Sequence, residues 1–337
     1  MKRLKYTYSE MHLSAVIGEK GSLFGLGERD PAPLFFNPDV QQLLKKLTRL
    51  DLTKVYRTRH SGKNLKPPQY KFLTTEELDE LMKDAEIQAE KKLQMPPVVK
   101  QRIENDENLS CDYELQGLTN DKIVFTDITY GISDKERVIV VRDPNGVLRK
   151  ANSEERHRMN ETYFPLPGRK IRIPHMFEKQ YLQRLLDHTK YEFVLDRACL
   201  QFEPDDPMYQ NVTTTVYETV DTNQHYNKLR STRHFGPFAF HLAWSHDYLR
   251  INPYAAKLKW LDEAVALVTL YHKLNPDAKS ANTKCQEGQE HEFIQTYIKQ
   301  DSKKRAALEL SLQANVELHK QREMVEANIR KAHGQVS

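Results

Sequence analysis

Residues 123–163 read IVFTDITYGISDKERVIVVRDPNGVLRKANSEERHRMNETY, and they contain strand, turn and helix patterns in close succession. β-Branched and aromatic residues over 123–130 indicate one strand. The continuous apolar run Val138–Val141 predicts a second strand that is covered on both faces. Asp143-Pro144-Asn145-Gly146 predicts a tight turn before a short return strand at Val147–Leu148, because proline presets φ and Asn-Gly accepts the left-handed region. The pattern predicts a small β platform without an active-site motif.

A capped helix is expected directly after this platform. Asn152 and Glu155 have the spacing of a helix start, where the asparagine side chain accepts a backbone amide proton. The helix should end near Tyr163, because two prolines follow within four residues. Arg169–Ile173 then alternates in the manner of a short edge strand.

Helical patterns dominate both sides of the platform. Asn37-Pro38 gives an N-cap followed by proline at the first helical position, and an apolar stripe continues to about Leu50. Thr74 and Glu77 form a capping-box pattern at the start of a helix that reaches about Leu93. Further helices are expected over 178–188, 191–202, 207–220, 255–274, 291–299 and 302–330. The predicted fold class is α+β and mainly helical, with the small β platform near the middle followed by packed helical hairpins.

The same patterns divide the chain into five parts. They are a flexible N-terminal arm with a potential targeting segment (1–36), N-terminal helices with a basic linker and an acidic connector (37–121), the β-rich platform with its capped helix (122–175), a helical domain (176–300), and a C-terminal helix and tail (301–337). Lys2, Arg3 and Lys5 favour a cleaved presequence, whereas Glu10 and Glu19 argue against it, so this question stays open.

Composition narrows the class of protein. Hydrophobic residues make up 39% and charged residues 29% of the 337 residues, which indicates a core together with much wetted or partner-facing surface. The net charge of +4 is too small to indicate nucleic-acid binding by itself. Cys111, Cys199 and Cys285 lie far apart, which argues against a disulfide framework and a cysteine-based zinc site. No run of eighteen apolar residues occurs, so we expect no transmembrane helix and no membrane partner.

Patterns typical of catalytic and cofactor sites are missing from the sequence. The glycines at 18, 21, 25 and 27 do not match GxGxxG and precede Pro31 instead of a helix. His241 and His246 are five residues apart, whereas zinc-binding pairs on helices prefer three or four. We therefore expect no enzyme activity, no cofactor, no metal and no small-molecule substrate. An enzyme built around His241 and His246 is the alternative that a deep pocket there would favour.

Positive charge is concentrated upstream of the platform. From Lys45 to Lys71 there are nine lysines and arginines against Asp51 alone, a net charge of +8 in twenty-seven residues. Aromatic side chains that can stack on unpaired bases lie among them, namely Tyr56, His60, Tyr70 and Phe72. Irregular basic segments tend to lie along phosphate backbones, from which they release counterions. The alternative is a solvated loop whose charges balance the acidic helix that follows.

Two further groups of cations lie at and beyond the platform. Glu154 and Arg158 have the spacing of a salt bridge within one helix, whereas Arg149-Lys150 and Arg169-Lys170-Ile171-Arg172 have no such local partner. The predicted RNA-binding residues are Lys45, Lys46, Arg49, Lys54, Arg57, Arg59, Lys63, Lys66, Lys71, Arg149, Lys150, Arg169, Lys170, Arg172, Arg230 and Arg233.

One apolar run follows these cations. Residues 235–244 read FGPFAFHLAW, and such a run belongs either in the core or at a buried contact with another protein. The residues predicted for a protein interface are Phe235, Phe238, Phe240 and Trp244.

Several blocks along the chain also resemble a known family. They are Lys92–Val98 (KLQMPPV), Val124–Tyr130 (VFTDITY), Glu136–Arg142 (ERVIVVR), Gly146–Lys150 (GVLRK), Tyr163–Pro165, Gly168–Ile171, Gln201–Asp205 (QFEPD), Leu229–Arg233 (LRSTR), Phe235-Gly236 and Leu270–Asp277 (LYHKLNPD). In this order, over roughly residues 38–315, the chain resembles the family of mitochondrial small ribosomal subunit protein 22. The first 36 residues, 278–300 and the last twenty residues depart from the resemblance.

The resemblance implies a non-catalytic component of the small subunit of the mitochondrial ribosome, located in the matrix. Its expected partners are small-subunit ribosomal RNA and other small-subunit ribosomal proteins, with a role in mitochondrial translation. The alternative is a non-enzymatic helical adaptor that binds only protein partners.

Overall fold

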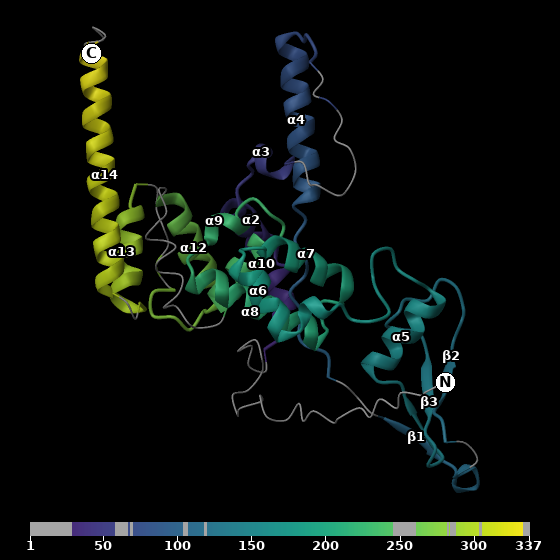
Figure 1. The fold of residues 1–337 in the computed structure, drawn as a ribbon. Helices are drawn as coiled ribbons and strands as arrows, with labels where there is room; N and C mark the ends of the chain where they lie inside the picture. The colour runs from purple at the N-terminus through teal and green to yellow at the C-terminus, as the bar shows by residue number, and fades with distance from the viewer. Residues whose placement is uncertain are drawn as a thin grey trace.

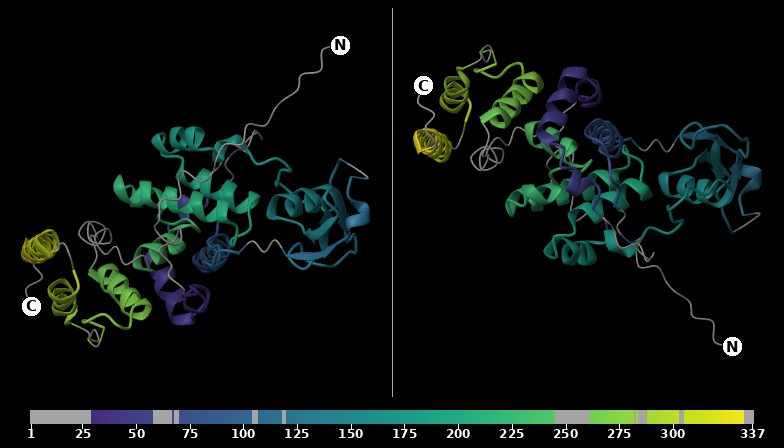
Figure 2. Two further views of the ribbon diagram at one scale, coloured as in Figure 1. Left: turned by 90° about the horizontal axis from the view of Figure 1, so that it is seen from below. Right: turned by 90° about the horizontal axis from the view of Figure 1, so that it is seen from above.

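The computed structural model describes residues 29–57, 67, 70–103, 107–117, 120–244, 261–281, 283, 288–302 and 305–332. Figure 1 shows a helical body in the middle, a small sheet with one helix at its side, and two long helices that stand out from the body. In the views from below and above, the sheet and the C-terminal helix lie at opposite ends of the molecule (Figure 2). The predicted fold class, α+β and mainly helical, is confirmed.

Helices precede and follow the four central strands. They are α1 Ala32–Phe35, α2 Pro38–Thr48, α3 Leu52–Val55, α4 Thr75–Lys92, α5 Ser153–Tyr163, α6 Lys179–Asp187, α7 Tyr191–Gln201, α8 Pro207–Thr222, α9 Tyr226–Leu229, α10 Phe235–Trp244, α12 Leu261–Leu274, α13 Glu290–Gln300 and α14 Arg305–Ala332, with the 3-10 turns η2 Tyr113–Leu115 and η3 His175–Phe177. The strands are β1 Asn108–Cys111, β2 Ile123–Thr126, β3 Ile139–Arg142 and β4 Val147–Lys150.

The four strands form one antiparallel sheet in the order β1-β4-β3-β2. This is a Greek-key order, because β2, β3 and β4 follow one another while β1 lies beside β4. Ile139 and Val141 of β3 are buried together with Ala151, and Met159 of α5 packs against them. The expectation that Val138–Val141 is covered on both faces is wrong, because α5 covers one face and Val138 is 63% exposed.

Two local expectations in this region are also wrong. Asn108–Cys111 lies in the expected acidic connector but forms β1, although all four of its residues are exposed. Residues 169–173 form no strand. The amide of Lys170 donates to Gln201 Oε1 at 3.1 Å and its carbonyl accepts from Gln201 Nε2 at 2.7 Å, so a side chain takes the bonds that a neighbouring strand would make.

The three helix starts predicted from capping residues are confirmed, whereas the expected start at 255 lies outside the described residues. Asn37 accepts from the Asp39 amide, and both Thr74 and Asn152 form complete capping boxes with the glutamate three residues later. The turn before β4 is also confirmed, with Gly146 at φ 81°. A Cβ on Gly146 would lie 2.0 Å from the carbonyl oxygen of Asp112, so glycine also permits the close approach of β1.

The core of the helical body is built around α10. Phe35 meets Phe240 edge to face at a ring-centroid distance of 5.3 Å, and Phe240 stacks on Trp244 at 5.6 Å. The four residues predicted for a protein interface (Phe235, Phe238, Phe240 and Trp244) are all buried within the chain itself. That prediction is corrected, because α10 is surrounded by α2 and α12 and its apolar residues fill the monomer's own core. Phe35, which lies within the range 1–36 expected for the N-terminal arm, is part of this core.

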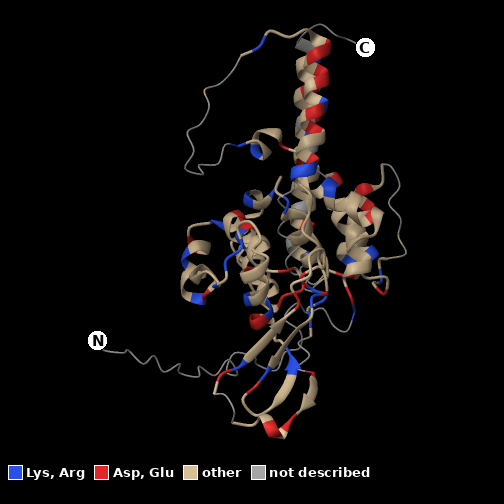
Figure 3. Cartoon of the chain, turned by 90° about the vertical axis from the view of Figure 1, so that its right-hand side faces the viewer, with Lys and Arg blue, Asp and Glu red and all other residues tan. Residues whose placement is uncertain are grey.

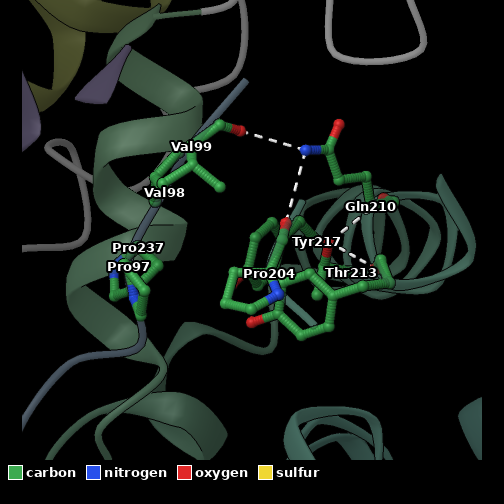
Figure 4. A pocket seen from close by; sticks show the side chains of 9 residues that line it. Pro97, Val98, Val99, Pro204, Gln210, Thr213, Tyr217 and Pro237 are labelled. Atoms are coloured by element: carbon green, nitrogen blue, oxygen red, sulfur yellow. Dashed lines mark hydrogen bonds between the residues drawn. The ribbon is translucent and has the colours of Figure 1, made fainter. Parts of the chain in front are cut away.

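Leu93–Ile103, a segment that belongs to no helix or strand, follows α4 and runs along α10 and α8. Gln210 Nε2 of α8 donates to the carbonyl of Val99 at 3.0 Å and to that of Pro204 at 3.4 Å (Figure 4). Beside these bonds the segment leaves only a hollow of about 20 Å³. The same segment also packs against α10. A Cβ on Gly236 would lie 1.9 Å from Met95 Sδ, so α10 approaches the segment at a residue that has no side chain.

Candidate nucleic-acid interface

Arg169, one of the predicted phosphate contacts, is directed into the molecule. Its guanidinium lies 2.6 Å from Glu203, 3.7 Å from Glu161 of α5 and 3.7 Å from Asp134 of the β2–β3 loop. The side chain is 9% exposed. Arg169 therefore joins the sheet unit to the helical body, and the structure does not present it to a phosphate backbone.

Arg149 has a comparable internal role. Its guanidinium donates to Asp143 at 2.8 Å and to Glu155 at 2.9 Å, and only 13% of the side chain is exposed. These hydrogen bonds raise the pKa of Arg149 far above its ordinary value, and the bond to Glu155 has the largest effect. Because Glu155 also completes the capping box of α5, Arg149 fixes this helix to the turn between β3 and β4.

Three further predicted cations pair with groups of the helical body. Arg49 and Arg230 both pair with Glu263 of α12, whose side chain is buried. Lys54 donates to the carbonyl oxygens of Asn227 at 2.7 Å and Lys228 at 3.2 Å, at the C-terminal end of α9. Cations at this end of a helix satisfy carbonyls that have no partner within the helix. Burial lowers the pKa of Lys54.

Arg233 also contacts a carboxylate of the body. Its guanidinium lies 2.9 Å from Asp196 of α7, which the buried His234 also contacts at 2.9 Å. Burial lowers the pKa of His234 even though this carboxylate opposes the shift. Arg233 and His234, which directly precede α10, are thus tied to α7 and not presented to a partner.

The remaining described cations of the prediction lie on the surface. Lys45, Arg57 and Lys150 face Glu90, Glu192 and Glu107 at 4.0, 3.9 and 2.5 Å in exposed pairs, which contribute little to stability. The side chains that are exposed and form no ion pair with the described residues are Lys46, Lys71, Lys170 and Arg172. Arg59, Lys63 and Lys66 lie outside the described residues.

Lys170 and Arg172 belong to a loop that borders an open hollow of about 700 Å³. The hollow lies between residues 165–175 and α7, and its lining includes Lys170, Arg172, His175 and Arg197. Glu161 is its only carboxylate, and this group is buried beside Arg169. The exposed charged side chains that line the hollow are therefore basic, which suits an anionic backbone, and the exposed Glu178 beside them pairs with His175 at 2.5 Å.

Two side chains of α7 hold the backbone of this loop in place. Gln201 bonds both backbone groups of Lys170, and Arg197 donates to the carbonyl of Gly168 at 2.7 Å. These contacts fix the backbone while the side chains of Lys170 and Arg172 face solvent. Sequence reasoning missed Arg197 and Gln201, because both lie thirty residues away on a helix whose spacing gives no sign of the loop.

A second exposed stretch precedes α4. Tyr70, Lys71 and Phe72 are all exposed, the two aromatic rings almost completely. Tyr56, in contrast, packs under the ammonium of Lys92 at 4.0 Å and donates to the carbonyl of Ala85. Of the aromatic residues predicted to stack on bases, Tyr70 and Phe72 are thus the accessible ones, while His60 lies outside the described residues.

The described residues contain no arrangement typical of metal chemistry or of membrane insertion. No group of three or more His, Cys, Asp or Glu side chains there could hold a metal ion. None of the helices placed by the structure is long and apolar enough to cross a membrane. His241 is buried in α10, whereas His246 falls in the 245–260 gap, so the predicted alternative site cannot be assembled from the described part.

Comparison of the sequence with known proteins identifies its family. The model of mitochondrial 28S ribosomal protein S22 matches residues 33–276. Small ribosomal subunit protein mS22 of Bos taurus is 40% identical over 285 residues, which cover 84% of this chain and 78% of the relative. The Mus musculus protein of the same name is 39% identical over 289 residues, 85% of this chain and 79% of the relative. This chain therefore belongs to the family of mitochondrial 28S ribosomal protein S22, whose members are ribosomal proteins of mitochondria and not enzymes.

Proposed function

We propose that this chain is a structural component of the small subunit of the mitochondrial ribosome, where it contacts ribosomal RNA and neighbouring proteins in support of mitochondrial translation. The observation that carries the ribosomal role is the family match over residues 33–276 together with relatives named as small ribosomal subunit proteins. The RNA contact rests on the exposed cations of the described surface.

The loop of residues 165–175 is the first part of the proposed RNA contact. Lys170 and Arg172 are exposed on a backbone that Gln201 and Arg197 hold in place. A fixed loop loses little conformational entropy when its cations meet phosphates. The hollow beside it gives room for a sugar-phosphate backbone, whose phosphates Lys170 and Arg172 would neutralise.

The exposed stretch 70–72 is the second part. Tyr70 and Phe72 flank Lys71, so two rings and one cation stand in solvent next to one another. Unpaired bases of RNA stack on such rings, and a cation between them can meet the adjoining phosphate. These groups would therefore meet a single-stranded loop or bulge, not a regular duplex.

Salt-dependent binding tests this proposal. Purified chain should bind a transcript of small-subunit ribosomal RNA, and the double variant Lys170→Gln/Arg172→Gln should reduce the slope of log affinity against log salt by about 2. Lys299→Gln, an exposed lysine of α13 outside the hollow, is the matched control and should leave the slope unchanged. An unchanged slope in the double variant would remove the loop from the RNA contact.

Sedimentation tests the ribosomal assignment independently of RNA contact. The chain should co-migrate with the small subunit in mitochondrial lysate, and ultraviolet irradiation of that fraction should yield RNA adducts at Tyr70 or Phe72. An adaptor that binds only proteins would keep its partners after nuclease treatment and give no such adducts. Migration away from the small subunit would contradict the structural role.

A further inference from the structure

Helix α4 carries an apolar stripe that its own chain covers only in part. Leu78, Leu81, Met82, Ala85 and Ala89 follow at spacings of three and four residues, so they share one face of the helix. Leu78, Leu81 and Met82 are 48%, 49% and 49% exposed, whereas Ala89 is completely buried. The N-terminal half of the stripe is thus open and the C-terminal half is covered.

The covered half shows that this face is built for packing. Helix α3 lies against it, with the hydroxyl of Tyr56 donating to the carbonyl of Ala85 at 2.8 Å. The ammonium of Lys92 lies 4.0 Å from the centre of the same ring. The open half therefore continues an existing contact surface instead of forming an isolated group of apolar residues. Figure 1 shows this half standing clear of the helical body.

Acidic residues border the stripe on both sides. At 100° per residue, Glu77 and Asp84 fall along one edge, and Asp79 and Glu86 fall along the other. The whole helix has seven carboxylates against three lysines, a net charge of −4 (Figure 3). A phosphate backbone would be repelled by these borders, and so would the same face of a second copy of this chain.

We propose that the open half of the α4 stripe, centred on Leu81 and Met82, docks onto a helix of another small-subunit protein whose apolar face is bordered by lysine and arginine. This inference rests on the proposed ribosomal function, which supplies such neighbours. Two facing amphipathic helices with opposite border charges would bury the leucine and methionine side chains and pair the borders. Residues 58–66 and 68–69, which precede α4 and lie outside the described residues, contain one large apolar residue, Leu65, against the five apolar residues of the stripe.

Cross-linking inside the assembled subunit tests the proposal. The photoreactive residue p-benzoyl-phenylalanine is placed at position 81, or as a control at position 87, in the full chain. Ile87 is 54% exposed but lies on the opposite side of α4, so the two positions differ in face and not in exposure. After irradiation of the isolated small subunit, position 81 should form an adduct with a peptide of another small-subunit protein that contains lysine or arginine. Position 87 should not form this adduct.

Matched substitutions measure the contact itself. Leu81→Gln/Met82→Gln should lower incorporation of the chain into small subunits, in competition with the unaltered chain, by roughly tenfold, which corresponds to about 1.4 kcal/mol of lost contact. Ile87→Gln should leave incorporation unchanged. Because Leu81 and Met82 are exposed in the free chain, the double variant should unfold at the same denaturant concentration, which separates docking from stability.

Each other occupant gives a distinct result that overturns the proposal. Adducts at position 81 with RNA, with a second copy of this chain, or with residues 58–69 of the same chain would identify a different cover. Full incorporation of the double variant, or no adduct at position 81, would show that the stripe stays open. In both of these cases co-migration with the small subunit would leave the proposed function intact. A chain that does not co-migrate would contradict that function and, with it, this docking site.

Discussion

Arg169 shows how a single side chain can decide between an internal and an external role. Three carboxylates from the β2–β3 loop, from α5 and from the connection after α7 surround its guanidinium. A buried carboxylate is costly unless a cation and hydrogen bonds compensate it. Glu161 is buried and depends on Arg169 for that compensation. The arginine is therefore a structural requirement of the junction between sheet and helices.

Replacing Arg169 should destabilise the chain, whereas replacing its exposed neighbour should not. We expect Arg169→Met to lower the free energy of unfolding by about 3 kcal/mol, because Glu161 would stay buried without a cation. Arg172→Met, at an exposed position of the same loop, should change it by less than about 0.5 kcal/mol. Denaturant unfolding followed by circular dichroism measures both. Equal effects of the two substitutions would contradict the internal role of Arg169.

Protonation of His234 should weaken the fold at mildly acidic pH. Burial lowers its pKa below the ordinary 6.5, although the Asp196 carboxylate at 2.9 Å opposes this shift. As the pH falls through 6.5 the unfolded chain binds a proton that the folded chain does not, so this contribution is complete above 6.5 and is lost toward the folded pKa. His272, whose pKa burial also lowers, acts in the same direction.

Unfolding midpoints at pH 7.5 and 5.5 measure this effect. The midpoint should fall on acidification in the unaltered chain, and it should fall by less in His234→Gln, where the contribution of His234 is removed. An equal fall in both proteins would show that His234 is not the group responsible.

Among the secondary-structure elements, the hairpin of β3 and β4 depends on one glycine. Gly146 has φ 81° and its Cα faces the carbonyl of Asp112 at the end of β1. Gly146→Ala should lower the free energy of unfolding by more than about 1 kcal/mol, because the added methyl group collides with backbone as well as straining φ. Gly131→Ala is the control, since φ is 85° there but no atom lies within 4 Å. If thermal denaturation shows no difference between the two variants, the collision has been overestimated.

Helix α14 should be dispensable for stability in its second half. Leu308 is buried and Leu312 packs against the core, whereas every side chain described between 317 and 330 is exposed. Deleting residues 317–337 should change the free energy of unfolding by less than about 0.5 kcal/mol. Leu308→Ala should cost about 3 kcal/mol by leaving a cavity. A large loss of stability in the truncated chain, measured by denaturant titration, would reveal contacts beyond residue 316.

The elements that sequence predicted are those whose signals are local. Asn37, Thr74 and Asn152 bond amides two or three residues further along the chain, and the turn that ends at Gly146 consists of four consecutive residues. The family resemblance is also confirmed, because it rests on short sequence blocks in a fixed order and needs no knowledge of the fold. β1 was missed because its four exposed residues carry no apolar alternation. α10 was missed because it is apolar on all sides, which removes the helical period.

The candidate site was less predictable, because its cations meet partners far along the chain. Arg169 and Glu203 are thirty-four residues apart, and Lys54 and Asn227 are one hundred and seventy-three apart. A count of charges along the sequence cannot distinguish such cations from Lys170 and Arg172, because similar residue types flank both in the sequence. Only the fold shows which side of the chain meets solvent.

The molecule as an entire body contains two unequal cores. The helical body holds the large apolar cluster, whereas the buried apolar residues in the described part of the sheet unit are Ile139, Val141 and Ala151. Ion pairs such as Lys135 with Asp205 at 2.9 Å join the two, along with Arg169. Because apolar burial supplies most of the stability of a core, the sheet unit should open before the body does.

Native-state hydrogen exchange tests this order of opening. Amides of β3 should exchange at lower denaturant concentration than amides of α7 and α10, and the difference should grow with salt, which weakens the ion pairs between the two units. Simultaneous exchange of all three elements at every salt concentration would show a single cooperative unit.

The length of the segment Leu93–Ile103 determines how far apart α4 and the sheet unit lie. The segment is fixed at Met95 against Gly236, at Val99 by Gln210, and at Arg102, whose amide donates to Asp205. One added residue in an extended chain lengthens it by about 3.3 Å, and fixed points on both sides leave no slack to absorb it. The number of residues in this stretch therefore fixes a distance within the molecule. It sets the distance between α4, with its proposed docking face, and Arg102, which donates to Ser153 of the sheet unit.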